Sequence, residues 1–117
     1  MNNGLFGKTA EDFVVNYLQQ NQFRIVARNY KKFFGEIDII AQKDDVITFV
    51  EVKARKNSKV SMFELVSYDK QKKIIQTAHS FIAENYNSKI YYRFDVALVY
   101  IDSCELLKVM YVPNAFV

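Results

Sequence analysis

The chain has 117 residues, of which 50% are hydrophobic and 25% are charged, and its formal net charge is +3. This balance is typical of a packed globular protein and excludes a disordered or fibrous one, so we expect a single domain over residues 1–117. The one cysteine, Cys104, cannot form an intramolecular disulfide. The first residues lack the apolar segment of a signal peptide, and no apolar run approaches the roughly 18 residues of a membrane helix. We therefore expect a cytoplasmic protein that does not enter a membrane.

Hydrophobic spacing predicts a mixed α/β domain in which helices flank one central sheet, in the order αβββαββ. A pattern resembling a capping box begins at Thr9, and apolar residues then recur at helical spacing. Alternating residues predict strands, two of which flank a four-residue turn at Gln42–Asp45 and form a hairpin. In chain order, the predicted elements are a helix over residues 9–20, strands over 23–30, 35–41 and 46–54, a helix capped by Ser67, and strands over 91–101 and 106–112.

The predicted hairpin gathers acidic side chains on one face of the sheet. Its four-residue turn pairs Glu36 with Glu51 and Asp38 with Phe49. Because the side chains of a strand alternate, Glu36 and Asp38 lie on the same face as Glu51, and Lys53 joins them there. We therefore expect three carboxylates and one ammonium group to emerge side by side.

Such a face suits a divalent cation and phosphodiester chemistry. Carboxylates about 4 Å apart repel each other by about 4 kcal/mol at an effective dielectric constant near 20, and a cation relieves that repulsion. Mg²⁺ or Mn²⁺ fits oxygen ligands, whereas the sequence offers no His or Cys cluster for zinc. Lys53 could orient or deprotonate an attacking water and contact the scissile phosphate. The alternative is a surface hairpin with a cross-strand ion pair.

Two segments carry a family resemblance. GEIDIIA (Gly35–Ala41) and FVEVKAR (Phe49–Arg55) resemble the signature of the YraN-like uncharacterised bacterial proteins. Further matches extend the resemblance from about Gly7 to Val99, and these are Glu11, Arg28–Tyr30, Glu64–Ser67 with Lys70, and Arg93–Val96. This family is similar to the restriction-endonuclease-like PD-(D/E)xK nucleases and, among them, to archaeal Holliday junction resolvases.

The resemblance implies a restriction-endonuclease-like fold and a set of site residues. By it, Asp38 and Glu51 are expected to be metal ligands, Lys53 the catalytic lysine, and Glu11 a helix-borne acid that completes the metal and catalytic site. The residues alone leave two roles open. Glu11 also fits an acid in a first helical turn, where the helix dipole favours it. Glu36 either supports the metal ligands or points away from them.

Three basic clusters could meet the phosphates of a nucleic acid. The candidate contacts among them are Lys31, Lys32, Arg55, Lys70 and Lys73. Solvated surface side chains are the alternative for each cluster. A phosphate contact is favoured for Lys70, because the helix dipole disfavours a cation near a helix N-terminus.

Asp95 interrupts an apolar segment. A buried carboxylate costs free energy unless it is hydrogen-bonded, most simply by Arg93 or by a backbone donor. We therefore expect a structural role for Asp95.

Together these observations favour a Mg²⁺- or Mn²⁺-dependent nuclease that hydrolyses phosphodiester bonds in DNA, and the resemblance implies structured or branched DNA. Two alternatives remain, a non-catalytic nucleic-acid-binding module of the same fold and a scaffold for protein interactions. One small site must act twice, or within a symmetric homodimer, to cut both strands. The apolar tail Ala115–Val117 could form such an interface or cover the sheet.

Overall fold

The structure, a computed structural model, describes residues 3–117, apart from the side chains of residues 3–7, 62 and 63. Its elements are α1 (Asn3–Gln20), β1 (Arg24–Lys32), β2 (Gly35–Lys43), β3 (Val46–Ala54), α2 (Met62–Leu65), α3 (Tyr68–Glu84), β4 (Tyr91–Ile101) and β5 (Leu107–Phe116). The α/β prediction is confirmed, with the short helix α2 as an addition. Within the described range, no helix is long and apolar enough to cross a membrane.

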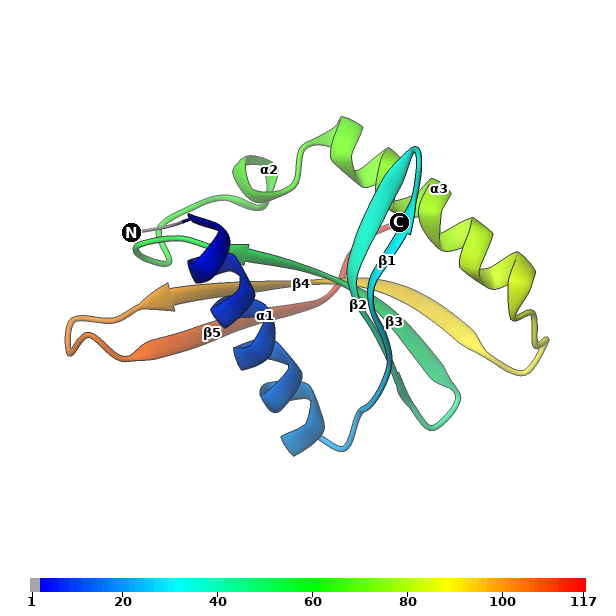
Figure 1. Cartoon of the computed structure of the whole chain (residues 1–117), viewed down its shortest axis with the longest axis horizontal. Coiled ribbons are helices and arrows are strands. Elements are labelled where there is room, and N and C mark those ends of the chain that lie inside the picture. Colours follow the sequence, from blue (N-terminus) through cyan, green and yellow to red (C-terminus); the bar gives the residue numbers. More distant parts are fainter. Residues whose placement is uncertain (1–2) are drawn as a thin grey trace.

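The five strands follow one another across the sheet in chain order (Figure 1). The pairs β1–β2, β2–β3 and β4–β5 are antiparallel. β3 and β4 are parallel, because the connection through α2 and α3 returns the chain to the end of the sheet from which β3 started. The sheet is therefore mixed, as the sequence predicts.

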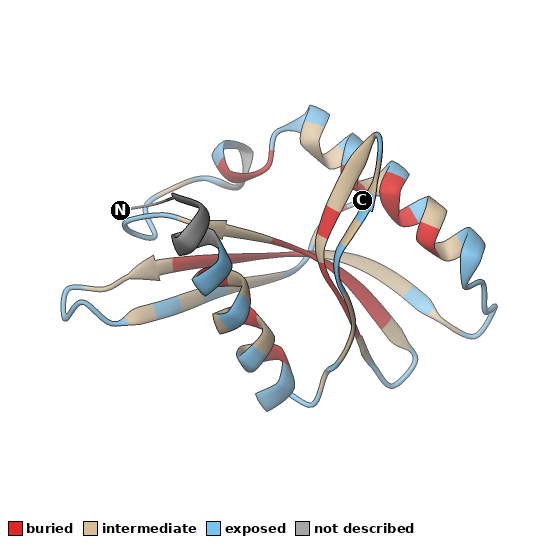
Figure 2. Cartoon of the chain, viewed as in Figure 1, coloured by how far each residue is buried: buried red, intermediate tan, exposed pale blue. Residues whose placement is uncertain are grey.

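Each long helix covers one face of this sheet. The buried side chains that α1 presents to the sheet are Ala10, Val14 and Leu18. On the other face, α3 buries Ile74, Ala78 and Phe81. The buried segments accordingly run through the middle of the sheet and along one stripe of each long helix (Figure 2). This layering leaves the ends of the strands as the places where side chains from both layers can meet.

The helix starts show which local signals were informative. Ser67 is the N-cap of α3, as predicted, and its Oγ accepts a hydrogen bond from the backbone N–H of Lys70 at 3.2 Å. By contrast, α1 begins at Asn3, so Thr9 lies inside the helix and the predicted start at Thr9 is wrong. A capping-box pattern can therefore occur within a helix when earlier residues extend it.

Both outer strands extend beyond their predicted ends. β1 continues to Lys32 and β5 continues to Phe116. Phe116 is buried and stacks on Phe94, with 5.1 Å between the ring centroids. The apolar tail was expected either to form an interface or to cover the sheet, and its residue Phe116 covers the sheet.

The predicted register between β2 and β3 is wrong by two residues. Lys43 pairs with Val46 and Ile40 pairs with Phe49, so the turn has two residues, Asp44 and Asp45, in place of four. Asp44 has a φ of 55°, a left-handed conformation that closes a tight turn and that Asp tolerates. Because an even shift keeps each side chain on its own face, the paired residues Ile39–Lys43 keep their predicted faces. The alternation breaks at Asp38, where Ile37 and Ile39 lie in opposite cores, so the predicted placement of Glu36 on the face of Glu51 is wrong.

Candidate active site

The strands β2 and β3 separate where their acidic residues begin. Their paired residues run back from the turn to Ile39 and Val50. Beyond that pair, the Asp38 side chain takes the place of a backbone acceptor, because its Oδ2 accepts a hydrogen bond from the Val52 N–H at 2.8 Å. Ile37 packs in the α3-side core whereas Ile39 packs in the α1-side core, so β2 twists at Asp38. The twist places the Asp38 carboxylate between the two helical layers.

Glu51 lies beside this separation with almost no exposure to solvent. Its side chain is 5% exposed, and it projects from β3 on the face that carries the core residue Phe49. Among the described residues, its Oε2 has no hydrogen-bond partner. A buried carboxylate oxygen without a partner is costly, which makes this atom a natural ligand for a cation or acceptor for a proton.

Glu51 disturbs the ionisation of Asp38. Burial, followed by the close approach and negative charge of Glu51, raises the pKa of Asp38 to about 8. The Val52 N–H and the Lys70 ammonium oppose this rise. Asp38 therefore favours holding a proton near neutral pH when no cation is bound.

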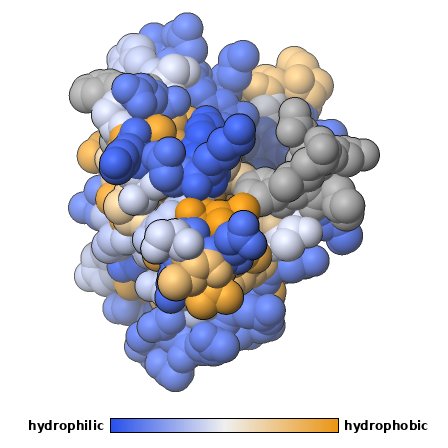
Figure 3. All heavy atoms as spheres, turned by 90° about the vertical axis from the view of Figure 1, so that its left-hand side faces the viewer, coloured by the Kyte–Doolittle hydropathy of each residue, from blue (hydrophilic) through white to orange (hydrophobic). Residues whose placement is uncertain are grey.

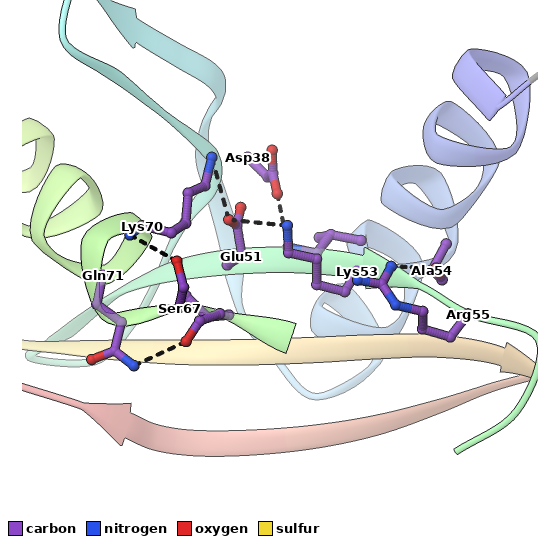
Figure 4. A network of polar contacts seen from close by, with 10 residues as sticks. Asp38, Glu51, Lys53, Ala54, Arg55, Ser67, Lys70 and Gln71 are labelled. Atoms are coloured by element: carbon purple, nitrogen blue, oxygen red, sulfur yellow. Dashed lines mark hydrogen bonds and ion pairs between the residues drawn. The ribbon is translucent and has the colours of Figure 1, made fainter. Parts of the chain in front are cut away.

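Two ammonium groups approach the same carboxylate oxygen from different elements (Figure 4). The Nζ atom of Lys53, on β3, lies 3.8 Å from Glu51 Oε2, and that of Lys70, in the first turn of α3, lies 3.7 Å from it. Both distances exceed hydrogen-bond length, so each amine balances charge while it keeps donors for a ligand. The prediction placed Lys70 on a phosphate, and the structure places it beside Glu51.

Glu11 approaches the pair from the other layer. It lies in the interior of α1, so the alternative of an acid in a first helical turn is wrong. Burial raises the pKa of Glu11, and the charge of Asp38 and, less strongly, of Glu36 raises it further. Arg28 opposes these effects, with its Nη2 atom 3.6 Å from Glu11 Oε1. Asp38, Arg28 and Glu36 therefore form the electrostatic surroundings of Glu11.

The donor set fits a hard divalent cation held by two carboxylates. Asp38 and Glu51 supply oxygens, including the unpartnered Oε2, and Mg²⁺ commonly uses one or two carboxylates together with waters and phosphate oxygens. Among the described side chains, no group of three His, Cys, Asp or Glu residues is close enough to hold a metal ion. Glu11 is thus near the predicted ligands without forming a ready three-carboxylate cluster with them.

Of the remaining basic candidates, three are exposed and one forms an ion pair within the protein. Lys31, Arg55 and Lys73 are exposed. Lys32 forms an ion pair with Glu84, with 3.1 Å between Nζ and Oε1, so its charge is already used within the protein. Arg55 begins the exposed loop at the end of β3, on the left of Figure 1, and the view from that side in Figure 3 is largely hydrophilic.

Sequence reasoning missed the partners of the acidic residues. It did not foresee the Val52 amide on Asp38, the Arg28 guanidinium beside Glu11, or the Lys70 ammonium beside Glu51. Only Arg28 left a signal, as a basic residue in a strand expected to pack near the first helix. The other contacts depend on how the elements meet in space.

Comparisons with known proteins agree with one another. A model of the uncharacterised protein family UPF0102 matches residues 10–99. A UPF0102 protein of Dictyoglomus turgidum is 42% identical over 118 residues, which cover 99% of this chain and 100% of the relative. Another, from Clostridioides difficile, is 43% identical over 117 residues, with 99% and 100% coverage. These matches bear out the resemblance to the YraN-like proteins, and the chain therefore belongs to the uncharacterised protein family UPF0102.

Proposed function

We propose that this protein is a divalent-metal-dependent nuclease of restriction-endonuclease-like fold that hydrolyses phosphodiester bonds in DNA. The observation that carries the proposal is the buried, unpartnered Oε2 of Glu51 beside Asp38, at the point where two strands separate. A purely structural ion pair is expected to close to hydrogen-bond distance. Here Lys53 and Lys70 stand at 3.8 and 3.7 Å, which suits groups that serve a further ligand.

Asp38 and Glu51 would hold Mg²⁺ or Mn²⁺, and Glu11 adds negative charge from α1. A bound divalent cation supplies charge stabilisation at the phosphate and a water acidic enough to attack at neutral pH. The carboxylates also exclude an uncompensated anion from the site, because two nearby negative charges repel a phosphate that arrives without a cation.

The lysines supply the remaining catalytic contacts. Lys53 shares a strand face with Glu51, so its amine contacts the scissile phosphate and orients the attacking water. Lys70 balances the Glu51 charge in the free protein and turns toward phosphate when substrate arrives. Glu36 supports the site through its charge near Glu11.

The exposed basic side chains give the substrate its docking surface. Lys31, Arg55 and Lys73 are available to the DNA backbone, and such contacts position the strand without reading its sequence. The resemblance to junction-cleaving enzymes favours structured or branched DNA. To cut both strands, the single site acts twice or works within a symmetric homodimer.

Cleavage assays test this proposal. We expect wild-type protein to cut at least one member of a labelled panel of linear duplex, single strand, flap, four-way junction and structured RNA, in Mg²⁺ or Mn²⁺ and not in EDTA. Lys53→Ala is expected to lower the rate by about 100-fold or more, which is the typical cost of removing one group that stabilises transition-state charge. Lys89→Ala is the matched control, because exposed Lys89 lies at the opposite end of the sheet, before β4.

Two results would contradict the nuclease. Equal cleavage by wild type and Lys53→Ala would show that the activity comes from elsewhere or from a contaminant. Binding without cutting across the whole panel, weakened strongly by salt, would favour the non-catalytic binding module instead.

A further inference from the structure

The turn between β1 and β2 carries a pair of aromatic side chains that the catalytic site does not use. Phe33 is 101% exposed, and its ring meets that of Phe34 edge-on, with 4.9 Å between centroids and 79° between planes. Phe34 itself is half-buried. The turn therefore presents one aromatic ring entirely to solvent beside a half-buried one.

This hairpin tip is fixed against the helix that also reaches the candidate active site. A Cβ atom at Gly35 would lie 2.4 Å from Thr77 Oγ1 and 3.0 Å from the Lys73 carbonyl oxygen, so the β2 backbone touches α3 directly. Lys70 is one turn earlier in α3 and lies beside Glu51. The tip and the site are therefore held at a set separation.

That separation matches the length of a short stretch of DNA. Asp38 follows Gly35 by three residues on β2, which is about 10 Å at about 3.3 Å per residue, and Phe33 lies a little further away. A DNA strand advances about 3.4 Å per nucleotide. A strand that runs from the site to the tip would span about three to four nucleotides.

The charges around the tip suit a polyanion. Lys31 on β1 and Lys73 on α3 are both exposed beside it. Glu36 is the acidic residue that faces Lys31 in the β-sheet register, and Glu84 neutralises only Lys32. Lys73 thus adds positive charge beside the tip, where Lys31 faces Glu36.

We propose that Phe33 stacks on an unpaired base at a branch point of DNA while the scissile phosphate lies at Asp38 and Glu51. The proposal rests on the proposed nuclease function and names the side chain that recognises the branch. Bases inside a linear duplex hide both faces against their neighbours, whereas a flap or junction offers an unstacked face to an aromatic side chain. The exposed ring therefore selects branched over linear DNA and places the cut about three to four nucleotides from the branch.

Binding measured in EDTA tests this selection apart from catalysis. Fluorescence anisotropy compares a labelled flap with a linear duplex of equal length, for wild type, Phe33→Ala and Phe33→Trp. We expect Phe33→Ala to weaken flap binding by about tenfold and duplex binding by less than about twofold, with Phe33→Trp retaining the preference. Tyr86→Ala is the control, because Tyr86 is exposed in the loop that follows α3, away from this tip.

Each outcome bears on one proposal only. Equal losses on flap and duplex, no loss on either, or no preference for the flap by wild type would overturn the role of Phe33. Failure of the nuclease proposal is a different result, namely the absence of metal-dependent cleavage, which an assay in EDTA does not measure. Since Phe33 contacts almost no core, its replacement leaves the fold intact, and thermal denaturation verifies this.

Discussion

The Asp38 and Glu51 carboxylates share a buried position in which one oxygen of Glu51 has no hydrogen-bond donor among the described residues. Their mutual repulsion destabilises the doubly ionised pair when no cation is present. Lys53 and Lys70 reduce this repulsion from 3.8 and 3.7 Å without forming hydrogen bonds to that oxygen. The pair is therefore a place where function is expected to oppose stability.

Replacement of Asp38 tests this opposition. The folded protein raises the pKa of Asp38 from the ordinary value of 3.8 to about 8, so the folded state binds more protons than the unfolded state between these values. Stability of the cation-free protein therefore falls as pH rises through that window. Asp38→Asn removes the titration and keeps an acceptor for the Val52 N–H.

We accordingly expect Asp38→Asn in EDTA at pH 8 to have a Tm about 4–8 °C above that of wild type, which corresponds to about 1 kcal/mol. The difference should shrink toward pH 5, where Asp38 is protonated in the folded wild type. Thermal denaturation across this pH range measures both effects. A lower Tm at pH 8, or a difference that does not change with pH, would contradict the account.

At the scale of elements, the contact between β2 and α3 depends on a missing side chain. Gly35 has a negative φ, so its role is steric, because any Cβ at this position would meet Thr77 Oγ1 at 2.4 Å. Thr77 is buried, and its hydroxyl donates a hydrogen bond to the Lys73 carbonyl at 2.7 Å. Neither the Thr77 hydroxyl nor the Lys73 carbonyl can move aside easily, so β2 can pack this closely against α3 only if residue 35 is glycine.

Gly35→Ala is therefore expected to destabilise the protein by about 1–3 kcal/mol, the usual cost of overpacking. Chemical denaturation measures this change. Thr77→Ala removes the oxygen that the new Cβ would meet. The double variant should therefore lose less unfolding free energy than the two single variants lose in sum. Additive losses, or an unchanged unfolding free energy for Gly35→Ala alone, would show that β2 and α3 can move apart without loss of stability.

A second element contact joins β4 to β5 through Asp95. This fully buried carboxylate accepts hydrogen bonds from Arg93 Nε at 3.1 Å, from Tyr111 Oη at 2.5 Å and from the Asn114 N–H at 2.8 Å. Burial and the Asp95 charge raise the pKa of Tyr111, which keeps its hydroxyl a donor. The predicted structural role of Asp95 is confirmed, with Tyr111 as a partner that the sequence did not indicate.

Tyr111→Phe deletes one of these donors and should lower stability by about 1.5–3 kcal/mol, the range for a hydrogen bond to a charged group. Urea unfolding provides the measurement, with Tyr86→Phe at an exposed position as control. Because the contact lies outside the candidate site, cleavage by folded Tyr111→Phe should match wild type. Unchanged unfolding free energy would mean that the remaining donors satisfy Asp95 alone.

The predicted bounds of helices and strands match the observed ones where neighbouring residues determine them. Alternation and β-branched residues marked Val46–Ala54 and Tyr91–Ile101 at their observed ends, and the Ser67 hydroxyl marked the start of α3. The length of the turn could not be predicted in this way, because Gln42–Asp45 is polar throughout. Its residue types do not reveal that Asp44 adopts the left-handed conformation that closes the turn. The register therefore came out two residues off.

For the site, spacing predicted that Glu36, Asp38, Glu51 and Lys53 share a sheet face. Lys53 Nζ does lie 3.8 Å from Glu51 Oε2, and Asp38 approaches Glu51 at the point where β2 twists out of regular alternation. The twist at Asp38, which brings Glu11 within reach of its charge, arises from packing against both helical layers. Sequence periodicity carries no information on such a twist.

At the scale of the whole molecule, the chain combines exposed basic side chains with a buried acidic pair. The net charge of +3 is small, and the account relies on the positions of Lys31, Arg55 and Lys73 more than on the total. Two carboxylates alone would repel DNA, so the exposed cations must offset that repulsion for DNA to bind. DNA binding is thus expected to depend on ionic strength.

The double variant Lys31→Ala/Lys73→Ala should bind every DNA more weakly. The slope of log K against log salt concentration should become less steep by about 2, because each phosphate contact contributes about 0.9 to it. Anisotropy at several salt concentrations gives the slope. The control replaces Lys43 and Lys89, exposed near the opposite end of the sheet. An equal change of slope in the control would indicate general attraction without a defined surface.

The central claim, that Asp38 and Glu51 hold a divalent cation for phosphodiester hydrolysis, is tested most directly by calorimetric titration of the protein with Mn²⁺ at pH 8. The account predicts saturable binding by wild type, accompanied by proton release, and loss of that binding in folded Glu51→Gln. Absence of binding by wild type, or equal binding by Glu51→Gln, would contradict it.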